Sequence, residues 1–502
     1  MPPTIGKSGA GGSITIWAAA KKADRPVNNQ NYRMSNAVSI PSPAAVVVQL
    51  RVIPREQHCI SRKNISSAAL RVLYRLNEAG FAAHLVGGAV RDLLLGGRPK
   101  DFDIATNATP EDVKRLFRNC RLIGRRFRLA HVVFGSEIVE VATFRGSSDD
   151  GSGDRHVVDG RIVRDNVYGT IEEDAVRRDF TVNALYYDIS DFSVRDYVGG
   201  YEDLARRELR LIGDPVSRYR EDPVRMLRAV RLAAKLDFTI APDARAPFDD
   251  LGELLLQAPP ARLFDESLKL FLAGSGLKSF RALDTSGLLA DVFPLTARAL
   301  AFRGGATARA MIEQGLADTD ARIAADKSVT PAFLFAILLW GPVRAQVQRE
   351  IDKGTEPSAA WVRVANQIIA EQAKHVAIPR RFSVTMLEIW LLQPRFEQRM
   401  KKRVFRLLAH PRFRAAYDFL VLRAGESPEM AELAAWWTEA QTVPHDALAA
   451  RLNSTAVTHL AADESAAEQA DSETPDTTEA KKRRPRRRRR SGPSATATAP
   501  TE

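Results

Sequence analysis

The stretch LVGGAVRDLLLGGRPKDFDIAT, residues 85–106, combines two glycine pairs with two aspartates that stand one residue apart. Residues 82–86 predict a short strand, and the glycine pair at 87–88 allows the backbone to turn tightly after it. Residues 89–95 predict a helix, which the second glycine pair ends. A second strand is expected over 101–105. The stretch therefore predicts a strand, a tight turn, a helix and another strand in close succession.

The two aspartates of the second strand, Asp101 and Asp103, project from one side because strand side chains alternate between faces. Like charges this close repel each other, and a nearby cation is the usual condition for both to stay ionised. A lone DxD pair is often only a solvated turn. The glycine turn beside it favours a different interpretation, because such a turn can bind phosphate.

The turn suits phosphate since Gly87 and Gly88 leave backbone N–H groups and a helix N-terminus exposed, and Arg91 adds a positive charge one helical turn later. Oxygen ligands beside a triphosphate suit Mg²⁺, which proteins commonly hold with a couple of carboxylates and the substrate phosphates. Two such ions can activate an attacking hydroxyl and stabilise a leaving oxygen. The cluster therefore predicts nucleotidyl transfer.

The whole chain has 502 residues, enough for about two to four domains, and 45% of them are hydrophobic. It contains no run of 18 apolar residues, so we expect no membrane span and interpret the protein as soluble and cytoplasmic. Cys59, Cys120 and the eight scattered histidines show no metal-binding spacing. Neither a disulfide framework nor a zinc site is expected.

Four motifs in order resemble those of the tRNA nucleotidyltransferase and poly(A) polymerase family, the class II nucleotidyltransferases. They are GGAVRD with KDFDIAT, EVATFR at 140–145, RRDFTVNALYYD at 177–188 and REDPVRMLRAVRLAAKL at 220–236. The resemblance covers roughly residues 55–240. Two further segments, VIPREQHCISRKNIS at 52–66 and LIGRRFRLAHV at 122–132, resemble the bacterial poly(A) polymerases of this family.

The resemblance implies an α+β fold, in which a head with a small mixed β-sheet is followed by an all-α neck and body. We expect the catalytic head over 56–200, a neck that recognises the nucleotide base over 201–275, and a helical body over 276–455 that is a candidate for RNA binding. Residues 1–55 mix Gly, Ser, Pro and Asn without periodicity, and 456–502 are highly charged. Both ends are expected to be disordered.

The segment 129–144 predicts a β-hairpin whose turn, Gly135–Ser136, suits type II′. Glu140 then lies in mid-strand, where an acidic side chain is costly unless it faces solvent or is paired. It is either a third metal-site carboxylate or a solvent-facing residue. Asp179 competes for the first role, because the family pattern implies an active-site residue there, although it could simply pair with a neighbouring arginine. Arg178 beside it suits triphosphate or base contacts.

Asp222 and Pro223 predict a helix start, with Pro223 at the first helical position and Asp222 as the N-cap. Asp222, Arg225 and Arg228 then stand about one turn apart on one side. Capping and surface ion pairs would explain this pattern on their own. The resemblance implies a base-reading site instead, in which Asp222 accepts from an exocyclic amino group and Arg225 donates to the adjacent ring nitrogen.

Adenine and cytosine share that donor–acceptor edge. The Asp222 and Arg225 pair can therefore reject uracil and guanine without separating ATP from CTP. Pocket size or the arginines of GRRFRLAH, residues 124–131, are the remaining candidates for that choice.

Three other segments carry weaker signals. Residues 146–166 are polar and Gly-rich, and we expect a mobile loop beside the active site, with His156 at its surface.

Beyond residue 240, helical periodicity predicts an α-helical body. Within it, residues 401–419 interleave Lys and Arg with Phe and Tyr, a pattern that could track RNA. Aromatic residues at helical spacing are more often part of a core, so both interpretations stay open.

The C-terminal tail divides into two charge blocks. Residues 461–480 contain seven acidic residues, and KKRRPRRRRR at 481–490 contains nine positive charges, which leaves +3 of the net +12 for the rest of the chain. Such a basic arm can bind RNA phosphates without reading sequence. The RNA-binding candidates there are Arg483, Arg484, Arg486, Arg487, Arg488, Arg489 and Arg490.

Together these features predict template-independent RNA polyadenylation, in which AMP passes from ATP to RNA 3′ ends, pyrophosphate leaves and the product feeds RNA processing or decay. The 3′-hydroxyl would attack the α-phosphorus while Asp101 and Asp103 hold two Mg²⁺ ions. A CCA-adding tRNA nucleotidyltransferase is the first alternative. An inactive RNA-binding scaffold on the same fold is the second, and the intact DxD and RRD motifs count against it.

Overall fold

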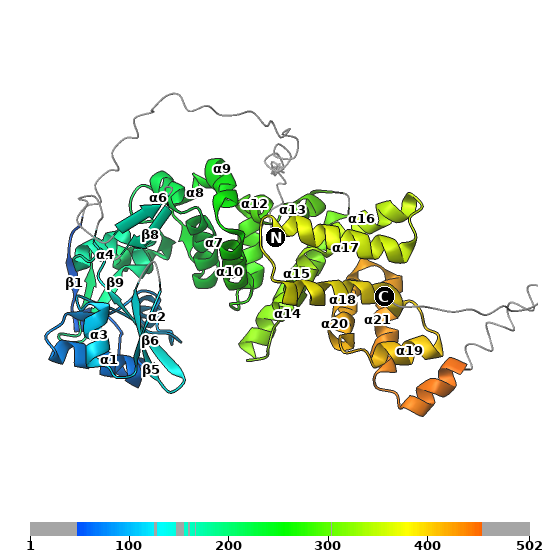
Figure 1. Cartoon of the computed structure of the whole chain (residues 1–502), viewed down its shortest axis with the longest axis horizontal. Helices are drawn as coiled ribbons and strands as arrows, with labels where there is room; N and C mark the ends of the chain where they lie inside the picture. Colours follow the sequence, from blue (N-terminus) through cyan, green and yellow to red (C-terminus); the bar gives the residue numbers. More distant parts are fainter. Residues whose placement is uncertain are drawn as a thin grey trace, which may run out of the picture.

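The computed structural model describes residues 48–453, apart from 125–127, 147–154, 159–160, 166 and 303, and it describes 155–158 and 161–165 as backbone only. The basic tail and its arginines therefore lie outside the described residues. A head that contains a β-sheet stands at one end of an elongated molecule, and helices follow it to the other end (Figure 1).

Eight strands of the head form one mixed sheet in the order β1-β10-β9-β2-β3-β6-β5-β4. Neighbouring strands are antiparallel except β3 and β6, which are parallel. The strands are β1 Arg51–Ile53, β2 Ala83–Val86, β3 Asp103–Thr106, β4 Cys120–Ile123, β5 Leu129–Phe134, β6 Glu137–Thr143, β9 Leu185–Asp188 and β10 Val194–Asp196. The expected α+β class with a mixed sheet is confirmed.

Helices cover one whole face of this sheet and part of the other. The first face carries α1 Ser67–Glu78, α2 Gly88–Leu94 and α3 Pro110–Leu116. Leu85, Ile104 and Val141 point into this core and are fully buried. On the second face, α4 (Ile171–Arg177) contributes Ala175 to a smaller core over β2 and β9.

The elements expected from the opening stretch form with small shifts. α2 begins at Gly88, one residue earlier than expected, and Gly87 before it has φ +75°, a conformation that glycine adopts without strain. β3 begins only at Asp103, so Asp101 precedes the strand. The alternation still holds, because Phe102 and Ile104 are buried while Asp101 and Asp103 are exposed.

The expected hairpin over 129–144 is present as β5 and β6, joined by Gly135 and Ser136. Gly135 has φ +61°, which a type II′ turn requires at its first central position. Within 146–166, where we expected a mobile loop, the structure contains a second hairpin, β7 (Arg155–Val158) with β8 (Arg161–Asp165), so this part of the segment is not a loop. The His156 side chain lies outside the described part.

Two expected domain boundaries differ from the structure. β1 pairs with β10 at the edge of the sheet, so the head includes residues that were assigned to the N-terminal extension 1–55. One continuous core runs from Phe180 through the neck to Phe419, so the division at 275/276 does not separate two cores. A further core begins at Leu392 and belongs to the C-terminal helices.

The helical region consists of short helices after the sheet and longer helices towards the C-terminal end. The neck helices are α5 Gly200–Arg206, α6 Pro215–Glu221, α7 Val224–Leu236, α8 Pro242–Arg245, α9 Phe248–Leu251 and α10 Pro260–Phe271. The later helices are α11 Gly276–Thr285, α12 Leu289–Val292, α13 Pro294–Ala301, α14 Gly305–Ala324, α15 Pro331–Leu338, α16 Trp340–Asp352, α17 Pro357–Ala373, α18 Arg380–Phe396, α19 Lys401–Leu408, α20 Phe413–Arg423 and α21 Pro428–Ala440. Within the described ranges, none of these helices could cross a membrane by length and apolar content.

The basic and aromatic segment 401–419 separates into two kinds of surface. Phe413, Tyr417 and Phe419 are buried in the cores, so they are not exposed for stacking on RNA bases. Lys401 and Lys402 are exposed on α19. Apart from the charged residues, only Phe405, which is partly buried against His445, therefore remains a candidate for RNA contact in this segment.

Candidate active site

Three carboxylates meet on the second face of the sheet. The parallel register of β3 and β6 places Asp103 directly beside Glu140, and the alternation of strand side chains puts Asp101 on the same side. The Glu140 side chain is 42% exposed. Of the two interpretations of Glu140, the geometry therefore favours a residue of the carboxylate cluster.

The cluster changes the acidity of its central member. The pKa of Asp103 is raised to about 6. The largest cause is the loss of water around its carboxylate, although the residue as a whole is exposed, and the negative charge of Glu140 is the second. Arg178 opposes this rise, and Asp101 adds a smaller contribution to it. Carboxylates that repel one another in this way are relieved when a cation binds between them.

The residues present fit Mg²⁺. Among the residues that the structure describes, no three His, Cys, Asp or Glu side chains are close enough to enclose an ion alone. Mg²⁺ does not need such an enclosure, because it usually binds one or two carboxylates together with substrate phosphates and water. Asp101, Asp103 and Glu140 would hold it, in keeping with the raised pKa of Asp103.

The glycine turn lies against this cluster. A Cβ atom at Gly87 would lie 3.7 Å from Nη1 of Arg178 and 4.0 Å from Oδ2 of Asp103. A side chain there would therefore occupy the space between the arginine and the carboxylate. The turn, Arg178 and Asp103 therefore lie together, and the adjacency of turn and aspartates is the one expected from the sequence.

Arg178 is held in place by two neighbours. Asp174 accepts hydrogen bonds from its Nε and Nη2 at 3.2 and 2.9 Å, and the Tyr186 hydroxyl lies 3.0 Å from Nε. Burial would lower the pKa of Arg178, but Tyr186 and Asp174 outweigh it and raise that pKa above its usual value. The guanidinium is thus a fixed positive charge beside the turn.

Arg91 is placed differently from the expectation. Its side chain is 4% exposed, and the guanidinium donates to Asp92 Oδ1 at 2.6 and 2.8 Å and to Asn183 Oδ1 at 2.6 Å. It lies next to Gly88, since a Cβ there would be 3.4 Å from Nη2 of Arg91. Arg91 therefore supports the turn from the protein interior, and the partly exposed cation at the turn is Arg178, whose side chain is 24% exposed.

Asp179 is also engaged by protein groups. Its Oδ2 accepts from Nε of Arg228 at 2.8 Å and from Nη2, and its Oδ1 accepts from the Phe180 backbone N–H at 2.9 Å. Burial would raise the pKa of Asp179, but Arg228 outweighs burial and lowers it. Of the two carboxylates that competed for the third position, Glu140 lies in the cluster and Asp179 pairs with Arg228.

The base-reading candidates lie at the start of α7. The helix begins at Val224, so Pro223 precedes it instead of occupying its first position, and Oδ1 of Asp222 accepts from the Val224 N–H at 3.2 Å. Arg225 donates from Nη1 to Glu221 at 2.8 Å and to the Arg218 carbonyl at 2.6 Å. Both side chains are thus held where the sequence predicted a base contact.

One residue that sequence reasoning missed completes this group. Arg262, on α10, donates from Nη1 and Nη2 to the two oxygens of Asp222 at 2.8 and 2.6 Å. No motif connects the two residues, which are 40 positions apart in sequence. Of the arginines in 124–131, Arg128 pairs with Glu111 of α3, and Arg125 and Arg126 lie outside the described residues.

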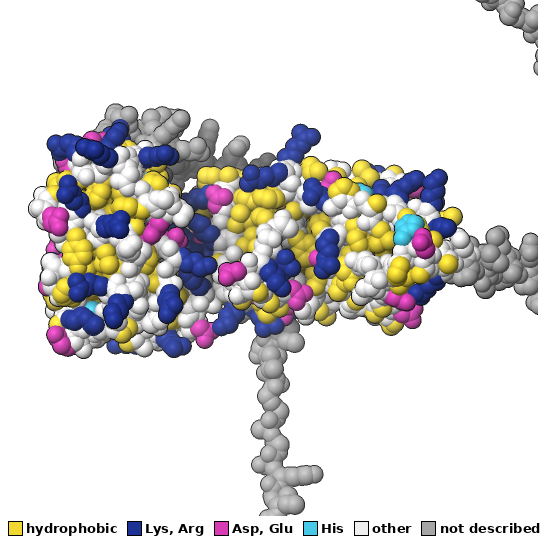
Figure 2. Space-filling model, turned by 90° about the horizontal axis from the view of Figure 1, so that it is seen from below, with side chains coloured by type: hydrophobic (Ala, Val, Ile, Leu, Met, Phe, Trp, Pro, Cys, Tyr) yellow, Lys and Arg dark blue, Asp and Glu magenta, His cyan; other side chains and the backbone are white. Residues whose placement is uncertain are grey.

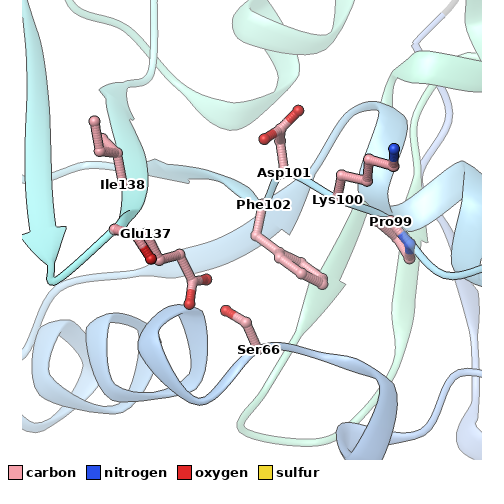
Figure 3. Close-up of a pocket in the computed structure, with 8 residues that line it drawn as sticks. Ser66, Pro99, Lys100, Asp101, Phe102, Glu137 and Ile138 are labelled. Carbon is pink, nitrogen blue, oxygen red and sulfur yellow. The ribbon is translucent and has the colours of Figure 1, made fainter. Parts of the chain in front are cut away.

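A cavity of about 570 Å³ opens beside the first aspartate. It is lined by Ser66, Pro99, Lys100, Asp101, Phe102, Ser136, Glu137 and Ile138. Figure 3 shows Asp101 and Ile138 pointing to one side of the strands, while Phe102 and Glu137 point the other way, towards Ser66. On a larger scale, Figure 2 shows a recess between the head and the helical part, with Lys and Arg side chains along it.

Family models match three parts of the chain. Residues 83–210 match the poly A polymerase head domain, 237–300 a probable RNA and SrmB-binding site of polymerase A, and 353–491 the polymerase A arginine-rich C-terminus. Together they cover both the head and the helical region.

Individual proteins agree with these models. Poly(A) polymerase I of Escherichia coli O6:H1 is 52% identical over 400 residues, which are 78% of this chain and 86% of the relative. A CCA-adding enzyme of Lactobacillus johnsonii is 37% identical over 228 residues, 45% of this chain and 56% of that enzyme. A tRNA nucleotidyltransferase solved with a primer tRNA and an ATP analogue shares the fold, with a TM-score of 0.51 and 23% identity over 74% of this chain and 98% of its own. The chain therefore belongs to the tRNA nucleotidyltransferase and poly(A) polymerase family, as a member of its bacterial poly(A) polymerase branch.

Proposed function

We propose that this chain polyadenylates RNA by using Asp101, Asp103 and Glu140 as the reaction centre, with ATP as the nucleotide and Mg²⁺ as the cofactor. The observation that carries the proposal is the direct pairing of Asp103 with Glu140, beside a glycine turn and the fixed guanidinium of Arg178. Relatives named poly(A) polymerase I, 52% identical over most of the chain, support this activity.

Mg²⁺ bound to the carboxylates would neutralise charge on the phosphates and lower the pKa of the attacking hydroxyl. The chain itself positions the reactants. The N–H groups of the Gly87–Gly88 turn and the charge of Arg178 would bind the triphosphate, and the carboxylates would lie next to its α-phosphorus. Such positioning and charge stabilisation supply most of the rate in phosphoryl-group chemistry.

Base selection in this proposal belongs to Asp222 and Arg225. Asp222 accepts from the amino group of adenine while Arg225 donates to the adjacent ring nitrogen. The two hydrogen bonds from the Arg262 guanidinium fix the plane of the Asp222 carboxylate. The oxygen lone pairs on the side away from Arg262 remain for the base. Arg228 contributes indirectly, because it is bound to Asp179.

CCA addition to tRNA is the second candidate. The observation in its favour is the CCA-adding enzyme that matches 45% of this chain at 37% identity. Adenine and cytosine share the edge that Asp222 and Arg225 would read, so this motif does not decide between the two activities.

A primer-extension assay separates these candidates. Purified protein is incubated with Mg²⁺, each NTP separately, and either an unstructured RNA or a tRNA that lacks its CCA end. Long tails formed with ATP alone on the unstructured RNA support polyadenylation. Addition of C, C and A followed by a stop, on the tRNA only, supports CCA addition. The absence of any product with both RNAs would indicate an inactive RNA-binding protein.

A further inference from the structure

The sheet continues past the carboxylates on the side away from the glycine turn. Its strand order places β2, which leads into the turn, on one side of β3 and places β6, β5 and β4 on the other. Asp103 on β3 and Glu140 on β6 therefore stand between the proposed triphosphate site and two further strands, β5 and β4.

One row of side chains crosses these strands. The registers pair Asp103 with Glu140, Glu140 with His131, and His131 with Arg121. Nε2 of His131 lies 3.3 Å from Oε2 of Glu140. Residues paired across neighbouring strands point to the same face, so the row that begins at the proposed metal ligand ends at Arg121.

The row lies on the open side of the sheet. The sequence neighbours of these residues point to the opposite face, and those such as Ala130 and Val139 are fully buried in the core of the first face. Arg121 is exposed, and no carboxylate of the described residues pairs with it. Ile123 and Ile138 point to the same face and are 39% and 51% exposed.

The geometry of the reaction indicates from which side the RNA 3′-hydroxyl approaches the phosphorus. In an in-line displacement the attacking and the leaving oxygen lie on opposite sides of the phosphorus. With the triphosphate at Gly87 and Arg178, as proposed above, pyrophosphate would leave on the β2 side of Asp103, where these two residues lie. The attacking 3′-hydroxyl therefore approaches over β6, β5 and β4.

We propose that the open face of β4, β5 and β6 binds the 3′-terminal nucleotides of the RNA, with Arg121 on a backbone phosphate and His131 as a positioning residue that orients Glu140. Single-stranded RNA offers phosphates for Arg121 and base faces for the exposed Ile123 and Ile138. This inference rests on the proposed function of the carboxylate cluster.

The first test compares Arg121→Ala with Arg71→Ala. Arg71 is an exposed arginine on α1, which covers the opposite face of the sheet. Loss of one charged phosphate contact is expected to raise the KM for RNA about tenfold and leave the KM for ATP nearly unchanged. It should also flatten the slope of log K for RNA against log salt by about 0.7. Arg71→Ala should match the wild type in all three measurements.

His131 is tested by a pair of variants. His131→Ala removes the group next to Glu140, and kcat should fall while the KM for ATP changes little. His131→Gln keeps a side-chain donor of similar reach and should restore most of kcat. Equal losses in both variants, with a lowered thermal midpoint, would mean that His131 has only a structural role.

The location of the RNA end can be measured directly on the wild-type protein. An RNA whose last nucleotide carries a photoreactive base and a 3′-deoxyribose binds without being extended. Its crosslink is expected within residues 121–138. Attachment to the neck or body helices instead would overturn the assignment.

Asp103→Asn separates the failure of this inference from the failure of the proposed function. If Asp103→Asn is inactive while Arg121→Ala and Arg71→Ala bind RNA alike, the RNA assignment is wrong and the reaction centre stands. If Asp103→Asn extends RNA normally, both are wrong. A rise in the KM for ATP alone in Arg121→Ala would also contradict the assignment, because it would place the nucleotide on this face.

Discussion

Asp179 and Arg228 form a salt bridge that connects the head to the first long helix of the neck, α7. Asp179 also lies 3.4 Å from Nδ2 of Asn183, whose Oδ1 accepts from Arg91 behind the glycine turn. A continuous polar chain therefore links the helix after the turn to the helix that carries the base-reading candidates. It fixes the distance between the proposed triphosphate site and the proposed base site.

Removing Asp179 should therefore affect stability before chemistry. Asp179→Ala leaves Arg228 without its partner, and breaking such a pair typically costs about 3–5 kcal/mol when it is fully buried. Because the Arg228 side chain is 35% exposed, we expect a loss of about 2–3 kcal/mol in unfolding free energy. Urea denaturation of Asp179→Ala, Arg228→Ala and the double variant measures the coupling. Additive losses would show that the two residues do not stabilise each other.

The carboxylate cluster should behave in the opposite way. Asp101→Ala and Asp103→Ala each remove a proposed metal ligand, so AMP incorporation should be lost while the fold stays intact. Glu140→Gln should also lower activity strongly without a loss of stability. Tailing activity near that of the wild type at saturating Mg²⁺, in any folded variant, would contradict the metal assignment for that residue.

The raised pKa of Asp103 predicts a pH effect on the metal-free protein. The folded-state pKa is about 6, above the ordinary aspartate value of 3.8, so the folded protein binds this proton more tightly than the unfolded chain does. Ionised Asp103 therefore destabilises the fold above pH 6, and this cost disappears as the pH falls towards 3.8. With EDTA present, Asp103→Asn should have a higher thermal midpoint than the wild type at pH 7.5, and the gap should narrow at pH 4.5. A gap that is constant with pH would show that Asp103 titrates normally.

Arg225 should contribute to nucleotide selection as well as to rate. By analogy with bidentate base readout, Arg225→Ala should reduce discrimination by about 1–3 kcal/mol, roughly ten- to a hundred-fold in the kcat/KM ratio of ATP to UTP or GTP. Arg281→Ala is a matched control, because Arg281 is an exposed arginine on α11 that pairs with Glu313 of α14. If the kcat/KM ratio of ATP to UTP or GTP is unchanged in Arg225→Ala, Arg225 has only a structural role through its bonds to Glu221 and Arg218.

Local sequence patterns predicted those features that depend on neighbouring residues. The strand, glycine turn and helix follow from residues that are adjacent in sequence, and so does the shared side of Asp101 and Asp103. The hairpin that places Glu140 in mid-strand is local as well. Its pairing with His131 could have been read from the hairpin register.

Features that depend on distant contacts could not be predicted in this way. The burial of Arg91 requires Asn183, 92 residues later, and Arg262 reaches Asp222 from another helix. An isolated arginine in a helix gives no indication of whether it will face a phosphate or a buried amide. For the same reason, β1 was not expected in the sheet, since its partner β10 is formed by residues near 195.

The basic run at 481–490 lies outside the described residues, and its prediction rests on charge alone. Nine positive charges in ten residues can bind RNA phosphates without reading sequence, so they should raise RNA affinity and the association rate but contribute nothing to the chemical step. Deleting residues 481–502 should therefore raise the KM for RNA at low salt and leave kcat and the KM for ATP nearly unchanged.

Salt provides the quantitative test of this last prediction. Each phosphate contact on a single strand contributes about −0.7 to the slope of log K against log salt, so the deletion should flatten the slope by several units at most. The difference between intact and truncated protein should shrink as ionic strength rises, because exposed charges are screened within about 8 Å at physiological salt. Titrations of both proteins with one RNA at three salt concentrations measure the slopes. Parallel lines with equal affinity would show that the arginines of the tail do not contact RNA.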